Sequence, residues 1–239
     1  MKTLILSTAV LALSAGLAMA QTVRMGTEGA YPPYNFINDA GEIDGFEREL
    51  GDELCARAEL TCEWVTNEWD SIIPNLVSGN YDTIIAGMSI NDERDEVIDF
   101  TQDYIPPATS SYVALSEDAD LSGVIAAQTS TLQSQYISES DATLLEYATA
   151  DEIIVALKNG EADAVFFDTD YLMPIVEESG GELMFLGETV TLGRGTGMGI
   201  RESDGELKDK FDAAITSMKD DGTLNTMLIK WFGEGTDTY

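Results

Sequence analysis

Short apolar runs alternate with segments of helical spacing along almost the whole chain. In the first half, strands are predicted at residues 22–27, 61–66 and 82–86, and helices at 46–58 and 69–77, with a short acidic helix after Asn91. Strands separated by helices cannot pair as hairpins, so this order predicts a parallel sheet covered by helices on both faces. The fold class expected is therefore α/β.

A second series of the same kind begins after Pro106-Pro107. Its strands are predicted at 110–115, 124–127, 144–147, 164–167 and 183–186, and its helices at 130–138, 150–158 and 169–178. Alternating glycines at 193, 195, 197 and 199 then suggest a flexible stretch, and helices at 206–220 and 224–232 follow. Two blocks with breakers between them predict two lobes joined by two crossovers that could act as a hinge. The alternative is one domain with two elaborate loops.

The first twenty residues have the pattern of a secretory signal peptide. Met1 and Lys2 precede an apolar run at 3–17, and Ala18-Met19-Ala20 matches an A-x-A cleavage site. A membrane anchor is the alternative, but the run is shorter than the ~20 apolar residues needed to span a bilayer. We therefore expect cleavage after Ala20 and export to the periplasm.

The two cysteines, Cys55 and Cys62, would then lie in an oxidising compartment, where a disulfide is the expected state. The alternative, a free thiol nucleophile, would need an activating partner, and the chain has no His to supply one.

Charge and composition exclude several classes of function. The chain has 12 Lys and Arg against 44 Asp and Glu, a formal charge of −32, which opposes binding to nucleic acid or to an anionic membrane. Without His and with two Cys, neither a His-based catalytic triad nor a zinc site can be built. The glycine-rich segment 193–197 lacks the pattern of a nucleotide-binding loop. We expect no metal and no cofactor.

Polar and aromatic side chains follow the predicted strands where an open parallel sheet binds its ligands, beyond the carboxyl ends. The candidate binding residues are Glu28, Tyr31, Trp69, Gly87, Ser89, Arg94, Ser130, Thr131 and Asp168. They would converge on one cleft if the two lobes face each other.

Each candidate has a simpler interpretation that the sequence leaves open. Arg94, near a helix start capped by Asn91, could bind a carboxylate, or it could balance the acidic residues around it. Asp168 could meet an ammonium group or cap the helix that follows it. Tyr31 and Trp69 could be core aromatics, and Glu28 could be solvated.

Several segments resemble a known family. They are TVRMGTEGAYPPYNF at 22–36, DGFERELGDEL at 44–54, DSIIPNL at 70–76, YDTIIAGMSINDERDEVIDF at 81–100 and DGTLNTMLIKWF at 221–232. The chain resembles the polar amino-acid-binding proteins of bacterial ABC importers, solute-binding protein family 3. It is most similar to the lysine/arginine/ornithine, histidine and octopine/nopaline binders, which have a short cysteine pair placed like Cys55 and Cys62.

The resemblance implies the type II periplasmic binding protein fold, with the ligand cleft between its lobes. The first lobe would comprise residues 21–108 and 195–239, and the second residues 109–194. A monomer is expected.

The resemblance also implies roles at the two ends of an α-amino acid. Arg94 would bind the α-carboxylate with Ser89 and Thr131, and Asp168 would bind the α-ammonium with Ser89 and the Gly87 carbonyl.

For the ligand side chain, the resemblance places Tyr31 and Trp69 on either side and Glu28 at the far end. The chain departs from the basic amino-acid binders at Ala86 and Gly87, where they have serines, and at Leu132, where they have a polar residue.

The function expected is capture of a basic or polar amino acid and its delivery to an ABC permease in the inner membrane. Arginine, lysine, ornithine or a related opine is the expected ligand, and no catalysis is expected. The alternatives are a dehydratase-like enzyme on the same fold, a binder of neutral amino acids such as glutamine, and the ligand-binding part of a receptor.

Overall fold

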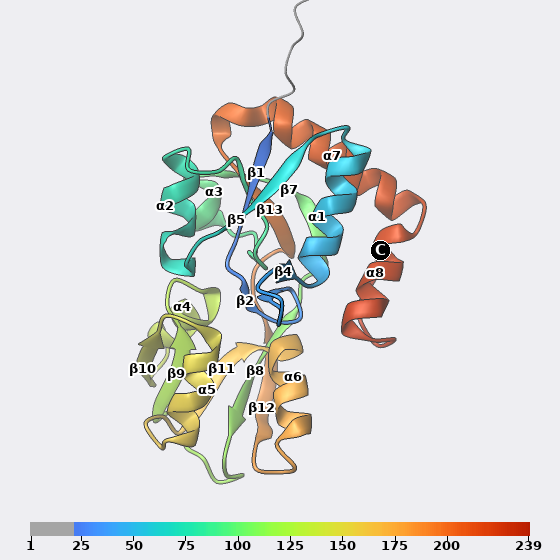
Figure 1. The fold of residues 1–239 in the computed structure, drawn as a ribbon. Coiled ribbons are helices and arrows are strands. Elements are labelled where there is room, and N and C mark those ends of the chain that lie inside the picture. The colour runs from blue at the N-terminus through green and yellow to red at the C-terminus, as the bar shows by residue number, and fades with distance from the viewer. Residues whose placement is uncertain (1–21) are drawn as a thin grey trace, which may run out of the picture.

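The computed structural model describes residues 22–239. The predicted signal peptide, residues 1–20, and its cleavage after Ala20 lie outside the described residues. Within these limits the chain forms two five-stranded sheets, each with its own helices, and a small three-stranded sheet near the junction between them. Figure 1 shows the two lobes one above the other, joined by two strands of chain that run side by side.

The first lobe contains a sheet of order β5-β1-β6-β13-β7. Its strands are β1 (Val23–Thr27), β5 (Cys62–Thr66), β6 (Thr83–Ile84), β7 (Asp99–Ile105) and β13 (Thr196–Ile200). The helices of this lobe are α1 (Phe46–Arg57), α2 (Ile72–Val77), α3 (Asp92–Asp95), α7 (Gly205–Asp220) and α8 (Thr223–Phe232), with single 3-10 turns at Trp69–Ser71 and Glu202–Asp204.

The second lobe contains a sheet of order β10-β9-β11-β8-β12. Its strands are β8 (Thr109–Ala114), β9 (Val124–Gln128), β10 (Thr143–Tyr147), β11 (Ala164–Asp168) and β12 (Met184–Thr191). Its helices are α4 (Leu132–Ser138), α5 (Ala150–Lys158) and α6 (Thr169–Glu178).

The elements expected from periodicity are present, and the parallel pairing predicted for the strands at 22–27, 61–66 and 82–86 is confirmed, but each sheet also contains antiparallel pairs. β1 pairs in parallel with β5 and β6, whereas β13 is antiparallel to both β6 and β7. In the second lobe, β8 is antiparallel to both β11 and β12. The reason is that the chain leaves the first lobe through β7 into β8 and returns through β12 into β13. Each five-stranded sheet therefore contains one strand, β13 in the first lobe and β8 in the second, that runs against the other four.

The glycine stretch is also not the flexible segment we predicted, because residues 196–200 form the buried strand β13. A Cβ on Gly197 would lie 2.8 Å from the Ile90 side chain, and one on Gly199 would lie 3.0 Å from Ile98. These glycines allow neighbouring side chains to pack against the strand. The sequence analysis also did not predict β7 or the small sheet of β2 (Ala30–Tyr31), β3 (Asn35–Ile37) and β4 (Ile43–Asp44).

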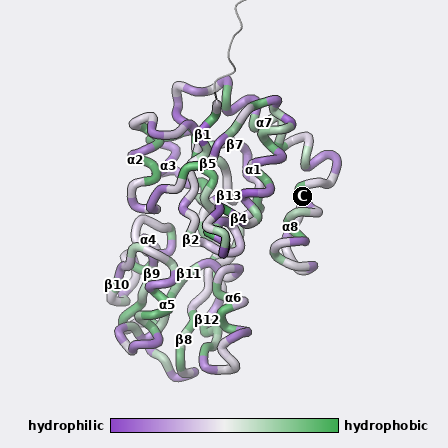
Figure 2. The backbone as a smooth tube through the Cα atoms, viewed as in Figure 1, coloured by the Kyte–Doolittle hydropathy of each residue, from purple (hydrophilic) through white to green (hydrophobic). Residues whose placement is uncertain are grey.

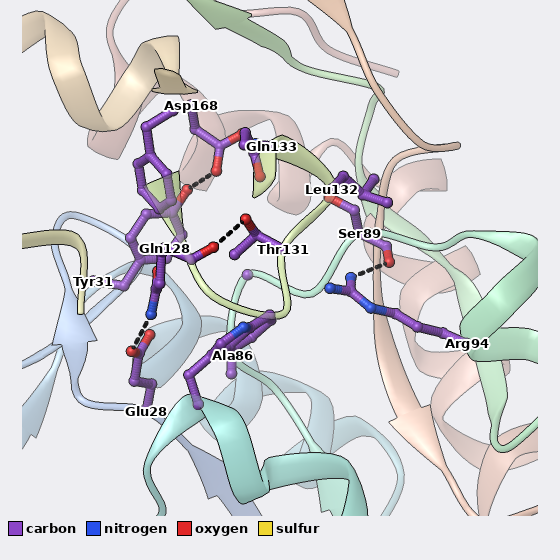
Figure 3. A pocket seen from close by; sticks show the side chains of 13 residues that line it. Glu28, Tyr31, Ala86, Ser89, Arg94, Gln128, Thr131, Leu132, Gln133 and Asp168 are labelled. Carbon is purple, nitrogen blue, oxygen red and sulfur yellow. Dashed lines mark hydrogen bonds between the residues drawn. The ribbon is translucent and has the colours of Figure 1, made fainter. Parts of the chain in front are cut away.

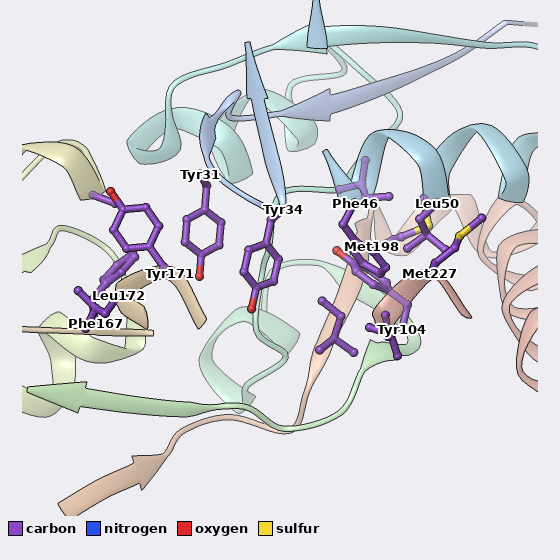
Figure 4. Packing of buried hydrophobic residues seen from close by; sticks show 14 of the residues in the cluster. Tyr31, Tyr34, Phe46, Leu50, Tyr104, Phe167, Tyr171, Leu172, Met198 and Met227 are labelled. Atoms are coloured by element: carbon purple, nitrogen blue, oxygen red, sulfur yellow. The ribbon is translucent and has the colours of Figure 1, made fainter. Parts of the chain in front are cut away.

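Apolar residues fill the space between each sheet and its helices, and polar residues dominate the outer turns (Figure 2). Helix α1 illustrates the pattern, since Phe46, Leu50 and Leu54 recur every fourth residue and are fully buried. The core also passes from one lobe to the other through aromatic side chains (Figure 4). Tyr31 stacks on Tyr34 of its own lobe and lies 5.5 Å, centroid to centroid, from Tyr171 of the other.

The predicted disulfide is present and joins the end of α1 to the start of β5. Cys55 and Cys62 are seven residues apart, with their Cα atoms separated by 6.3 Å. No helix in the part of the chain that the structure describes is both long and apolar enough to cross a bilayer.

Candidate binding site

One pocket lies between the two lobes and is lined by residues from both (Figure 3). The first lobe contributes Glu28, Tyr31, Trp69, Ala86, Gly87, Ser89 and Arg94, and the second contributes Gln128, Thr131, Leu132, Gln133, Phe167 and Asp168. Eight of the nine predicted site residues are thus brought together. The ninth, Ser130, contributes a backbone carbonyl to the Arg94 side chain.

The arrangement follows from where each side chain stands relative to its sheet. Glu28 directly follows β1, while Gln128 and Asp168 are the last residues of β9 and β11. Parallel strands direct their carboxyl ends to the same edge, and the two lobes turn these edges toward each other. Thr131 caps α4, since its hydroxyl accepts a bond from the Ser134 amide at 3.1 Å and donates to the Gln128 carbonyl at 2.6 Å.

Arg94 is the cation of the pocket and is only 9% exposed. Its guanidinium donates to the Ser89 carbonyl at 2.7 Å and, across the lobes, to the Ser130 carbonyl at 3.1 Å. Its central carbon lies 5.4 Å from the centre of the Trp69 ring. Burial lowers the pKa of Arg94 to about 10, so the side chain remains charged at neutral pH.

The alternative that Arg94 balances its acidic neighbours is wrong. Within residues 22–239, no carboxylate lies within salt-bridge distance of Arg94. Two of the neighbouring acids, Asp92 and Asp95, pair instead with Arg194, whose guanidinium nitrogen lies 2.6 Å from Asp92. Arg94 therefore keeps a positive charge beside the pocket without an anionic partner from the described chain.

Asp168 and Arg94 lie on opposite sides of the group of side chains drawn in Figure 3. Its carboxylate accepts bonds from the Tyr31 hydroxyl at 2.5 Å and from the Gln133 amide at 2.7 Å. Burial raises the pKa of Asp168 to about 6. It stands at the N-cap position of α6, as the alternative expected, but its side chain makes no capping bond and is directed to Tyr31 and Gln133 instead.

Glu28 is the second carboxylate of the pocket. It accepts a bond from the Gln128 side chain of the other lobe at 2.9 Å, and Gln128 also donates to the Ala148 carbonyl at 3.0 Å. Burial raises the pKa of Glu28 to about 7, because the ionised form loses contact with water. Glu28 is thus a partly buried acid that lines the pocket and has a partner in the other lobe, and the alternative of a fully solvated acid is wrong.

The two predicted aromatics both have partners within the protein. Tyr31 is 5% exposed and its ring centre lies 4.5 Å from that of Tyr34. Trp69 lies against the Arg94 guanidinium, and its ring nitrogen is 3.4 Å from the Ser130 carbonyl oxygen. Their placement on either side of a ligand side chain stays a prediction.

Three polar residues of this region are not among the predicted binding residues. Gln128 stands just beyond a predicted strand, in the same run as Ser130 and Thr131, and so had the positional signal but was given no role. Gln133 had no such signal, because only the tertiary structure brings α4 to Asp168. Glu47 lies in a predicted helix and is fully buried. Its burial cannot be predicted from the sequence, because acidic residues in helices usually face solvent.

The pocket is lined by one cation, Arg94, and by two carboxylates, Asp168 and Glu28, which lie apart from each other in Figure 3, together with amide, hydroxyl and aromatic groups. Such a site complements a small molecule with a carboxylate and one or more ammonium groups. Among the described residues, no cluster of three or more His, Cys, Asp or Glu side chains could hold a metal ion.

Two α/β lobes, two crossovers and a charged pocket between the lobes define a two-lobed solute-binding protein. The chain belongs to the bacterial extracellular solute-binding proteins, family 3, whose sequence pattern matches residues 23–234. The predicted family and the two-lobe fold class are thereby confirmed.

Relatives of known role bind amino acids or opines. The chain is 31% identical to the octopine-binding periplasmic protein of Rhizobium meliloti, covering 94% of this chain and 95% of the relative. It is 32% identical to the lysine/arginine/ornithine-binding periplasmic protein of Escherichia coli K12, covering 92% and 91%. A crystal structure of a periplasmic His/Glu/Gln/Arg/opine family-binding protein from Silicibacter pomeroyi, in complex with lysine, is 78% identical with a TM-score of 0.90, covering 91% of this chain and all of that one.

Proposed function

We propose that this protein binds a basic α-amino acid, with lysine as the first candidate, and presents it to an ABC permease. The observation that carries the proposal is the set of charges that line the pocket: Arg94, which pairs with no carboxylate of residues 22–239, and two carboxylates, Asp168 and Glu28, which lie apart from each other. The binding role in ABC transport agrees with the family and with its named relatives.

A zwitterionic ligand loses its hydration when it enters such a pocket, so each of its charges needs a partner. We assign the ligand's α-carboxylate to Arg94, with the Ser89 and Thr131 hydroxyls nearby. The α-ammonium is assigned to Asp168, with Ser89 and the Gly87 carbonyl. Ser130 acts through its carbonyl, which holds the guanidinium.

The ligand side chain is assigned to the space between Tyr31 and Trp69, with its end toward Glu28. A cationic tip would stabilise the ionised form of Glu28, which burial otherwise disfavours. The lysine seen in the 78% identical protein has such a tip. A neutral side chain such as that of glutamine would leave the carboxylate without a counter-charge.

Closure of the lobes would follow from ligand binding, because the residues assigned to the two charges of the ligand belong to different lobes. The bounds proposed are 21–108 with 195–239 for one lobe and 109–194 for the other, which agree with the membership of the two sheets. Arg94 belongs to the first lobe and Asp168 to the second, so the ligand gains its full set of contacts only when both are near. A ligand with this preference shifts the population toward the closed state, as in the hinge closure of periplasmic binding proteins.

We further propose that the mature protein is a periplasmic monomer, released by cleavage after Ala20, that works without a cofactor and catalyses no reaction. Family membership supports the periplasmic location and the permease as partner. The absence of turnover is tested by recovering lysine unchanged after prolonged incubation with the protein.

The test of the proposal is calorimetry on protein freed of bound ligand by unfolding, dialysis and refolding. Lysine, arginine, ornithine, octopine, glutamine and glutamate are titrated separately. The proposal expects the tightest binding among the ligands with a basic side chain and none for glutamate. Binding of glutamate or glutamine alone would overturn it.

A further inference from the structure

Glu47 is a fully buried carboxylate that lies outside the pocket, in the first turn of α1. No Lys or Arg side chain of the described chain lies within salt-bridge distance of it. A buried charge without a counter-ion is costly and needs hydrogen-bond donors to compensate it. An apolar side chain would fill the same space at lower cost, so the carboxylate calls for a physical explanation.

The donors that hold Glu47 come from three separate segments. The Gly87 amide donates to one carboxylate oxygen at 2.6 Å, and the Asn35 side chain donates to the other at 2.7 Å. The Tyr104 hydroxyl also donates to Glu47. Asn35 in turn accepts a bond from the Gly29 amide at 2.6 Å. Glu47 is thus bonded directly to β3, to the segment after β6 and to β7, and through Asn35 it is linked to the segment after β1.

The segments after β1 and after β6 contain residues that line the pocket. Gly29 lies between Glu28 and β2, which contains Tyr31, so its amide fixes the backbone that presents both side chains. Gly87 adopts a φ of +63°, and a Cβ there would lie 2.6 Å from the Tyr31 ring. Gly87 is therefore held between the Tyr31 ring and the Glu47 carboxylate, with little freedom to move.

Strand β7 leads to the crossover between the lobes. Tyr104 is fully buried in β7, two residues before Pro106, and packs near Phe46, the residue before Glu47 (Figure 4). A shift of β7 relative to the pocket loops would have to break or bend the bond between Tyr104 and Glu47.

We infer that Glu47 is a positioning residue for ligand binding: its carboxylate holds the backbone at Gly29 and Gly87 in the geometry the ligand requires and ties both to the strand that enters the first crossover. The inference rests on the proposed function. It assigns to Glu47 a role in affinity, beyond a contribution to folding, although Glu47 does not line the pocket.

Glu47→Gln is the informative variant because it keeps the size of the side chain. An amide has one acceptor oxygen and one NH₂ group, so it cannot accept bonds on both sides, and a buried donor is left unsatisfied. We expect lysine to bind roughly 10- to 100-fold more weakly, the factor that one unsatisfied buried donor is worth. We also expect the amide signals of Gly29 and Gly87 to shift in the NMR spectrum of ¹⁵N-glycine-labelled, ligand-free protein.

The control is a core substitution on the same helix that removes packing but no polar contact. Leu50→Val and Leu50→Ala should give a smaller and a larger loss in melting temperature, and the variant whose loss lies nearer to that of Glu47→Gln serves as the matched control. At a temperature where all variants are folded, the matched Leu50 variant should bind lysine within about threefold of the unchanged protein, as expected for a site that contacts no ligand.

Equal lysine affinity of Glu47→Gln and the matched Leu50 variant would overturn the inference, as would unshifted Gly29 and Gly87 signals. Either result leaves the proposed function intact if the unchanged protein binds lysine. Failure of the unchanged protein to bind any basic amino acid refutes the proposed function instead.

Discussion

Replacing Arg94 with alanine removes the only cation that residues 22–239 contribute to the binding pocket. In the structure its guanidinium is held by two carbonyls and by the Trp69 ring, and no carboxylate of the described chain neutralises it. The proposed ligand carboxylate would then be buried without a counter-charge. Removing one partner of such a buried pair costs about 3–5 kcal/mol. Since 1.4 kcal/mol is a factor of ten, lysine should bind roughly 150- to 4,000-fold more weakly.

The folded state itself should be affected far less than the ligand. The carbonyls of Ser89 and Ser130 lose their donor, but Arg94 also no longer bears the desolvation that lowers its pKa to about 10. These two effects oppose each other. We therefore expect a small change in the melting temperature of ligand-free protein and the loss of most of the stabilisation by lysine.

Calorimetric titration with lysine measures the affinity, and differential scanning fluorimetry with and without lysine measures the stabilisation. Arg48→Ala is the matched control, because Arg48 pairs with Asp52 on the exposed face of α1 and is 39% exposed. The control should bind lysine like the unchanged protein. An affinity of Arg94→Ala within threefold of the control would refute the assignment of Arg94 to the ligand carboxylate.

Three further predictions follow from single features of the structure. Burial raises the pKa of Glu28 from 4.5 to about 7, so the folded protein holds a proton that the unfolded chain releases. Ligand-free protein should therefore gain stability as the pH falls from 7 to 4.5. The affinity for lysine should fall over the same range, because a cationic ligand favours ionised Glu28, and equal affinities at pH 5.5 and 8 in calorimetry would contradict this. Glu28→Gln should remove part of the dependence and leave the part that comes from Asp168, whose pKa is about 6. The disulfide between Cys55 and Cys62 closes a loop of seven-residue separation, so its reduction should lower the free energy of unfolding by about 2.5 kcal/mol in urea titrations. Lysine affinity should not change, because the bridge lies at the end of the sheet away from the pocket, and a change in affinity would count against that separation. Gly87→Ala should lower both the melting temperature and lysine affinity, since the new methyl would lie 2.6 Å from a pocket tyrosine ring. Gly79→Ala has a similar positive φ but open space around it, and an equal loss of affinity there would show that strain alone is responsible.

Much of the binding site could be predicted from the positions of residues relative to strands. Glu28, Gly87 and Asp168 were chosen because they stand at or just beyond strand ends, and the structure places all three around one pocket. The sequence alone could not decide whether Asp168 capped a helix or Arg94 balanced nearby acids. Both questions depended on partners far along the chain, such as Tyr31 for Asp168 and Arg194 for the acids near Arg94.

Other features were beyond reach because they depend on packing between distant segments. The alternating glycines at 193–199 resemble a flexible linker, yet residues 196–200 pair with β6 and β7 and are buried. Gln133 and Glu47 carry no local pattern that separates them from surface residues of a helix. Their roles arise from the approach of Asp168 in one case and of Gly87 in the other.

The amino-acid sequence determined the order and kind of the main helices and strands, the cysteine pair and the acidic character, because periodicity, capping and charge are properties of neighbouring residues. Tertiary structure alone decided the direction of the returning strands, the isolation of the Arg94 charge and the burial of Glu47. These depend on which distant segments meet, and that choice is made by packing and hydrogen bonding over the whole chain.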